Sequence, residues 1–159
     1  LFSGKINPEL YAAYLKNQHP MYEVLEVCAM PHGLFNGIPE IRRAPSIYAD
    51  YQELQDPEKD EPDLLPVVHE YIKYILSIKD NPKKLMAHIY VRHMGDLAGG
   101  QMIAKRVPGS GKAYEFDDRP GLIKAMDSKL STDLVDEAIL GFELSGQIFD
   151  ELWEKIQNE

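Results

Sequence analysis

Helical periodicity runs through the long segments of this 159-residue chain. Between Pro66 and Ile78, for example, apolar residues recur three and four positions apart, and no alternating apolar and polar run is long enough to predict a strand. Two other segments open with the pair Asn-Pro, at Pro8 and Pro82, which joins a capping side chain to a residue favoured in the first turn of a helix. An all-α, single-domain fold over residues 1–159 is therefore expected.

The same pattern predicts the individual elements. Helices are expected from Pro8 past Leu25 with a bend at Pro20, from Pro66 to Ile78, from Pro82 toward Val107, near residues 120–129, and from about Thr132 to Ile156. Six prolines and two glycines between residues 29 and 66 predict short helices joined by turns. The last helix is expected to have an apolar face made of Leu134, Ile139, Phe142, Ile148, Phe149 and Trp153.

Composition excludes several classes of partner. The net charge of -9, from 26 acidic and 17 basic residues, argues against a nucleic-acid surface, because phosphate contacts need a basic patch. Neither an apolar run of 18 residues nor a signal peptide is visible, so a cytoplasmic monomer that does not enter the membrane is expected. Cys28 is the sole cysteine and is expected to be a small core residue, and no His or Cys pair has the spacing of metal ligands.

The stretch HMGDLAGGQMI, residues 93–103, places three glycines and an aspartate inside a predicted helix. Each glycine costs about 1 kcal/mol relative to alanine, so about 3 kcal/mol is given up. At 100° per residue, Gly95, Asp96, Gly99 and Gly100 fall with Arg92 inside an arc of about 140°. The glycines therefore share one face with the acid, and some close approach should compensate for them.

Two kinds of surface would use a glycine face: a tightly packed neighbouring helix, or a flat ligand laid across the backbone. Asp96 favours the ligand, because a carboxylate on a close-contact face is costly to desolvate without partners. Arg92, four residues earlier, is expected to be one such partner. The adjacent Gly99 and Gly100 predict a kink in the helix.

These residues resemble the signature of a known protein family. The stretch AHIYVRHMGDLAGGQMI closely resembles the signature helix of the heme oxygenases, and GKINPELYAAYLKNQHPMYEVLE and FELSGQIFDELWE resemble two further helices of that family. The resemblance covers nearly the whole chain. It implies a multi-helix heme-oxygenase-like bundle in which the glycines of a kinked distal helix lie against the porphyrin. It also implies that the chain is N-terminally incomplete, because the family's first helix, which carries the proximal histidine, has no counterpart here.

The resemblance assigns catalytic roles to three residues. Asp96 matches the aspartate that holds distal water and supports proton delivery to dioxygen, and Arg92 and Tyr22 match its network partners. The cofactor-binding residues that it implies are Tyr90, Gly95, Gly99, Gly100, Lys124 and Phe142, with Tyr90 at the heme edge, Lys124 toward the propionates and Phe142 on the pocket wall.

Some positions depart from the family pattern. His93 and Met94 stand where many relatives have tyrosine or a similar residue, and Ser145 replaces an expected asparagine. His88 matches a family histidine that is not the axial ligand and is expected to be structural, while His93 is expected to have no catalytic role. The iron ligand is therefore expected to be a histidine outside this chain.

The resemblance implies a heme oxygenase, with heme as substrate and cofactor. Such an enzyme opens heme at the α-meso carbon with dioxygen and an external reductant, here expected to be ferredoxin, and releases biliverdin, iron and carbon monoxide. The alternatives are a non-catalytic heme-binding or heme-oxygenase-like protein and an all-α domain of thiaminase-like architecture without heme. The pairing of Asp96 with Arg92 argues against both alternatives.

Overall fold

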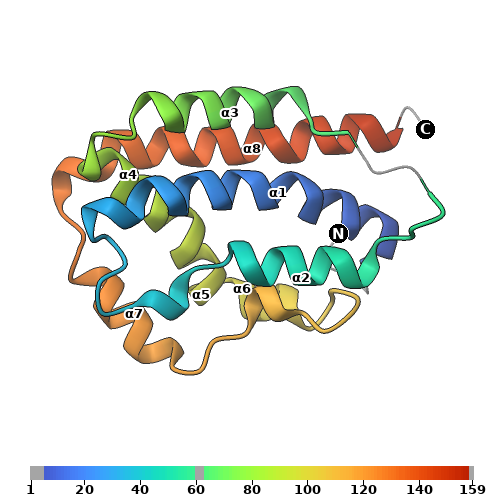
Figure 1. Cartoon of the computed structure of the whole chain (residues 1–159), viewed down its shortest axis with the longest axis horizontal. Helices are drawn as coiled ribbons and strands as arrows, with labels where there is room; N and C mark the ends of the chain where they lie inside the picture. The colour runs from blue at the N-terminus through green and yellow to red at the C-terminus, as the bar shows by residue number, and fades with distance from the viewer. Residues whose placement is uncertain (1–5, 60–62, 158–159) are drawn as a thin grey trace.

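A computed structural model of the chain describes residues 6–59 and 63–157, and their regular secondary structure is entirely helical (Figure 1). The α-helices are α1 (Pro8–Ala29), α2 (Ala44–Leu54), α3 (Pro66–Ser77), α4 (Pro82–Ile89), α5 (Gly95–Ala98), α6 (Gly100–Ala104), α7 (Arg119–Asp127) and α8 (Val135–Gln157). Short 3-10 helices lie at Met30–His32, Pro39–Ile41, Lys112–Tyr114 and Thr132–Leu134, and a π-helical segment spans Tyr90–Met94. The predicted all-α class is confirmed.

Local side-chain chemistry sets the predicted helix starts. The Asn7 side chain accepts hydrogen bonds from the backbone N–H groups of Glu9 and Leu10, at 2.8 and 3.2 Å, and Asn81 accepts one from Lys84 at 3.1 Å. Each cap satisfies N–H groups that have no partner inside the helix, and a proline follows directly. The α1 helix continues through Pro20 as one element.

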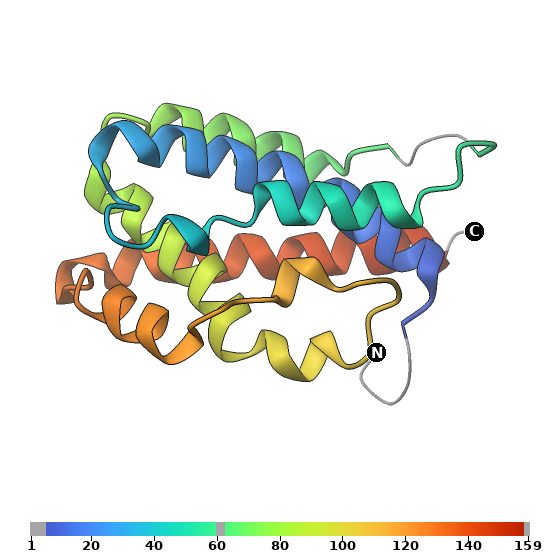
Figure 2. The same ribbon diagram turned by 60° about the horizontal axis from the view of Figure 1, so that its bottom comes forward.

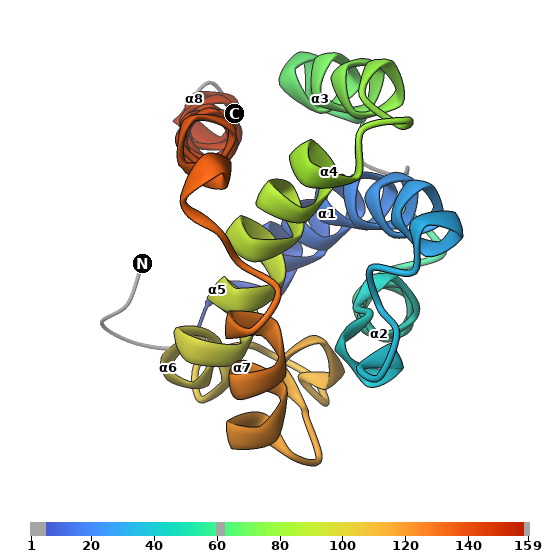
Figure 3. The same ribbon diagram turned by 90° about the vertical axis from the view of Figure 1, so that its left-hand side faces the viewer.

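The α1 helix is central to the packing. It contacts α2, α3 and α4, while α8 packs against α3 and α4 (Figures 1 and 3). The side chains of Leu25, Ile75 and Leu85 are fully buried between these helices. Burial of each such side chain contributes about 1.5–3 kcal/mol. Figure 2 shows the segment from α4 to α6 running away from this core toward one edge of the molecule.

The apolar face predicted for the last helix divides into two stripes. Leu134, just before α8, and Ala138, Ile148 and Leu152 within it are buried, whereas an adjacent stripe of large apolar side chains is exposed. The exposed stripe consists of Val135, Ile139, Phe142, Phe149 and Trp153. About half of the surface of Ile139, Phe142, Phe149 and Trp153 is therefore open to solvent and is not buried in the core as predicted. Cys28, which was expected to lie in the core, is partly buried against it. No helix within residues 6–59 and 63–157 is long and apolar enough to cross a membrane.

Candidate active site

The glycine-bearing segment is helical from Pro82 to Ala104 but is interrupted twice, first by the π-helical turns of Tyr90–Met94 and then at Gly99. The regular α-helix is broken at Gly99, which is the position where the glycine pair predicts a kink. Beside it, the guanidinium of Arg119 on α7 donates to the backbone carbonyl of Leu97, with Nε at 3.0 Å. A side chain from another helix thus binds a carbonyl at the place where the helix is weakened.

The three glycines have different surroundings. Gly95 and Gly99 are exposed; a Cβ atom at Gly95 would meet nothing within 4 Å, and one at Gly99 would meet only the Gly95 carbonyl oxygen, at 3.2 Å. Gly100 is buried, and a Cβ atom there would lie 2.6 Å from Cδ1 of Tyr114. Close packing inside the protein therefore accounts for Gly100, while Gly95 and Gly99 form an open backbone face. A cofactor contact stays a prediction for all three.

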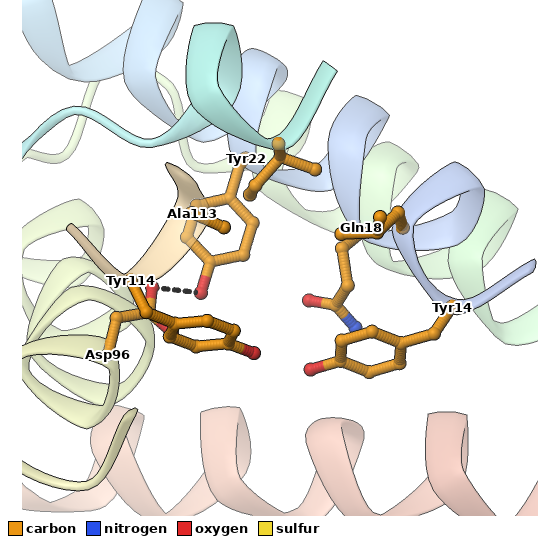
Figure 4. Close-up of a pocket in the computed structure, with 8 residues that line it drawn as sticks. Tyr14, Gln18, Tyr22, Asp96, Ala113 and Tyr114 are labelled. Carbon is orange, nitrogen blue, oxygen red and sulfur yellow. Dashed lines mark hydrogen bonds between the residues drawn. The ribbon is translucent and has the colours of Figure 1, made fainter. Parts of the chain in front are cut away.

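Asp96 lies next to this open face and is bound by Tyr22 of α1. The Tyr22 hydroxyl donates to Oδ2 of Asp96 at 2.7 Å (Figure 4). Burial raises the pKa of Asp96 to about 6, against the hydrogen bond from Tyr22 and the electrostatic effect of His93, Arg43 and Arg92, which lower it. The pKa of Tyr22 is raised well above its usual value by burial and by the negative charge of Asp96, so its hydroxyl stays protonated as a donor.

Arg92 does not bond Asp96, which corrects the expectation drawn from their spacing. Its Nε donates to the Tyr71 hydroxyl at 3.0 Å, and its Nη1 donates to Oε1 of Gln18 at 3.3 Å. The spacing argument assumes α-helical geometry, but the turns from Tyr90 to Met94 are π-helical and rotate Arg92 relative to Asp96. Arg92 affects Asp96 through its charge.

A buried hydrogen-bond chain fixes this π-helical segment in place. Tyr71, which receives the bond from Arg92, also bonds Nδ1 of His88 at 2.9 Å, and Nε2 of His88 bonds Oε1 of Glu137 at 2.8 Å. Burial lowers the pKa of His88, against the hydrogen bond and negative charge of Glu137. The predicted structural role of His88 is confirmed, because both of its ring nitrogens are bonded inside the protein.

A small pocket adjoins the Asp96–Tyr22 pair (Figure 4). This pocket is partly open to solvent and is lined by Tyr14, Leu15, Gln18, Tyr22, Ile47, Asp96, Ala113 and Tyr114. Figure 4 shows the hydroxyl ends of Tyr14 and Tyr114 and the amide of Gln18 pointing into it. The ring of Tyr14 also stacks on Phe149 at a centroid distance of 5.6 Å, which connects the pocket to the exposed stripe of α8.

The sequence interpretation missed Tyr14, Gln18 and Tyr114. The first two had a visible signal, because Tyr14, Gln18 and Tyr22 follow one another at intervals of four and so share one face of a helix. Tyr114 had none, since it lies in a 3-10 turn of a polar loop without periodicity.

The remaining predicted residues lie away from this pocket. Tyr90 is partly buried at the start of the π-helical segment, Lys124 is exposed on α7, and Phe142 is exposed on α8. Their cofactor roles stay predictions. The five histidines all fall within the described residues, and none of them lines the pocket.

Comparison with known proteins agrees with this geometry. A family profile described as heme oxygenase matches residues 1–131. Heme oxygenase from Guillardia theta is 31% identical, with 94% of this chain and 75% of that protein aligned, and human heme oxygenase 1 is 28% identical over 59% of this chain and 40% of its own length. The fold matches the crystal structure of Synechocystis heme oxygenase-2 in complex with heme and NO with a TM-score of 0.83, at 24% identity, over 99% of this chain and 77% of that one. These matches and the distal-helix geometry lead to one conclusion: the chain belongs to the heme oxygenase family.

Proposed function

We propose that this protein binds heme and opens it at the α-meso carbon, using dioxygen and an external reductant, to give biliverdin, iron and carbon monoxide. The observation that carries the proposal is the Asp96–Tyr22 hydrogen bond beside the open backbone of Gly95 and Gly99. This arrangement supports the proposal, because a carboxyl group with a pKa of about 6 lies next to a surface that a flat molecule can approach.

The described residues fit a porphyrin in two respects. Gly95 and Gly99 offer backbone without side chains, so a planar ring can approach them closely. On α8, the side chains of Phe142, Phe149 and Trp153 are 57, 48 and 54% exposed, which supplies aromatic surface for an apolar ring. The stacking of Phe149 on Tyr14 joins this surface to the pocket of Asp96.

Bound heme supplies the iron that activates dioxygen for attack on the heme ring itself. The protein contributes positioning and proton handling. Tyr22 orients the Asp96 carboxylate, and a pKa of about 6 lets that carboxyl group hold or release a proton near neutral pH. Gln18 and the hydroxyls of Tyr14 and Tyr114 offer further hydrogen bonds to water in the pocket.

The iron ligand proposed here is a histidine outside residues 1–159. The engagement of three of the five histidines elsewhere supports this: His88 and His93 are buried against carboxylates, and His32 bonds a backbone carbonyl at 2.7 Å. We also propose Tyr90, Phe142 and the ammonium group of Lys124 as heme contacts. A ferredoxin electron donor, a monomeric state and a cytoplasmic location are further parts of the proposal, resting on composition and the family resemblance.

The test compares Asp96→Asn and Asp96→Ala with the surface control Asp133→Asn in the full-length protein. We expect heme affinity to stay within a factor of about three in all variants, because Asp96 does not ligate iron. Bilin yield per heme reduced should fall by about 10²- to 10⁴-fold in both Asp96 variants, the range for loss of a general acid or base, and should not change in the control.

Bilin formation by the Asp96 variants at the parent rate would overturn the assigned role. A parent protein that gives a heme Soret band but no bilin would instead be the non-catalytic heme binder. Failure to bind heme at all would favour the thiaminase-like alternative.

A further inference from the structure

A second buried pair lies beside Asp96 and Tyr22. Nε2 of His93 is 3.0 Å from Oε2 of Glu26, and both side chains are fully buried. Glu26 also accepts hydrogen bonds from the backbone N–H groups of Arg43 and Ala44 at the start of α2, at 2.6 and 3.2 Å. Burial alone would raise the pKa of the Glu26 carboxyl, but the bonds from His93, Arg43 and Ala44 hold that pKa below its usual value. The carboxylate is therefore a fixed, ionised anchor.

The two pairs form adjacent links between α1 and the distal segment. Glu26 follows Tyr22 by one turn of α1, and His93 precedes Asp96 by three residues. The imidazole of His93 packs edge-on against the ring of Tyr22, with a centroid distance of 5.1 Å, and Phe35 lies on another side of it at 5.8 Å. Any displacement of the imidazole would thus move the ring whose hydroxyl binds Asp96.

Hydrogen bonding fixes His93 through one nitrogen. Nδ1 of His93 has no hydrogen-bond partner among the described residues, so the bond from Nε2 to Glu26 and the two ring contacts are what orient the imidazole. The charged and titratable groups near it are Glu26 and Tyr22 on α1, Arg42 and Arg43 before α2, and Asp96 on α5.

We propose that His93 is a positioning residue that acts through Tyr22: Glu26 holds the imidazole, the imidazole holds the ring of Tyr22, and the Tyr22 hydroxyl consequently stays on Asp96. The inference rests on the proposed function for its catalytic consequence, but its structural content concerns the protein without heme. A merely structural histidine would complete the hydrogen bonds of Glu26 and leave Asp96 unaffected.

The deciding variant is His93→Gln, because glutamine keeps an amide donor for Glu26 but removes the aromatic ring from Tyr22. The Asp96 carboxyl is followed by ¹³C NMR against pH in the heme-free full-length protein. We expect the pKa of Asp96 to rise in His93→Gln, because a displaced Tyr22 no longer donates to the carboxylate. His32→Gln is the control, since His32 bonds the backbone carbonyl of Lys79 at 2.7 Å and belongs neither to the Glu26–His93 pair nor to the chain that joins Tyr71, His88 and Glu137, and it should leave the titration of Asp96 unchanged.

A double-mutant cycle with Tyr22→Phe tests whether Tyr22 carries the effect. Most of the shift caused by His93→Gln should disappear in the Tyr22→Phe background. In the active enzyme, His93→Gln should slow bilin formation by about 2- to 10-fold, the equivalent of one hydrogen bond, and should do so only when Tyr22 is present. If His93→Gln does not fold, Glu26→Gln replaces it. This variant retains the imidazole of His93 but weakens the hydrogen bond that orients it.

Two results would overturn the proposal: an Asp96 titration that is unchanged in His93→Gln, or a shift of equal size with and without the Tyr22 hydroxyl. The second result would mean that His93 acts on Asp96 by its charge alone. Absence of bilin from the parent protein would refute the proposed function without touching the NMR result, so the two failures are distinguishable.

Discussion

A single methyl group placed at Gly95 or at Gly100 should have opposite effects on folding. Both residues are in the distal helical segment, so replacement by alanine gains up to about 1 kcal/mol of helix propensity at either position. At Gly95 nothing opposes that gain, because the new Cβ atom meets nothing within 4 Å. At Gly100 the Cβ atom would lie 2.6 Å from Cδ1 of buried Tyr114, so the ring must shift, at an overpacking cost of about 1–3 kcal/mol.

Urea and thermal unfolding of the heme-free protein measure these differences. Gly95→Ala should keep or raise the melting temperature, by up to about 2–4 °C for a chain of this size, and Gly100→Ala should lower it by up to about twice that amount. Heme titration should give the reverse order, with heme affinity reduced more in Gly95→Ala than in Gly100→Ala. The methyl group at Gly95 intrudes where the porphyrin is proposed to touch the backbone, so affinity should fall about 5- to 100-fold, the equivalent of the same overpacking cost.

The two variants control for each other, because each introduces the same group into the same segment. Unchanged heme affinity in Gly95→Ala would refute the idea that a ligand approaches the backbone there. A Gly100→Ala protein as stable as the parent would show that Tyr114 yields easily, and the packing explanation for Gly100 would then be wrong.

Three other changes test the electrostatics of the fold. Asp96→Asn should raise the free energy of unfolding above pH 6 and lose that advantage below about pH 4. Burial raises the pKa of Asp96 to about 6, so between about pH 4 and pH 6 the folded parent protein binds more protons than the unfolded chain and loses stability as the pH rises. Urea unfolding of both proteins at pH 4 and pH 8 would show the difference. Arg43→Lys should destabilise by about 1–3 kcal/mol, because one ammonium group cannot replace a guanidinium that donates to several backbone carbonyls including that of Glu115; a loss under 0.5 kcal/mol in urea would contradict this. Glu137→Gln should cost about 1–2 kcal/mol by weakening its bond to His88, and calorimetry that finds equal stability would count against the buried chain.

The helix starts were predictable because their causes are local. Asn7 and Asn81 cap helices with their own side chains, and the prolines that follow fit the first turn whatever lies elsewhere in the fold. The orientation of α8 was not predictable in this way. Its apolar residues cover a wider arc than one neighbour can bury, and contact with α3 and α4 decides that Ile148 is buried while Phe149 is exposed.

The site was predictable to the extent that it lies on regular helix. Tyr22 and Asp96 come from α1 and α5, and the family resemblance paired them correctly. Gln18 was within reach of the same reasoning, since it lies one turn from Tyr22. Tyr114 was not, because the loop that carries it takes its position from the backbone bonds that Asp50 accepts from residues 112 and 113, a tertiary contact with no sequence period.

The failed pairing of Arg92 with Asp96 shows what the π-helical turns contribute. In continuous α-helix, residues four apart lie on the same face, and an arginine and an aspartate at that spacing bond each other. Here the π-helical turns direct Arg92 to Tyr71 on α3 and to Gln18 on α1, and they leave Asp96 to accept from Tyr22. Had Arg92 bonded Asp96 directly, the carboxylate would be neutralised by a contact cation, which lowers a pKa. Because Arg92 and Arg43 act on Asp96 through their charge and not through a direct bond, burial prevails and the pKa of Asp96 stays near 6, where proton exchange at neutral pH is easiest.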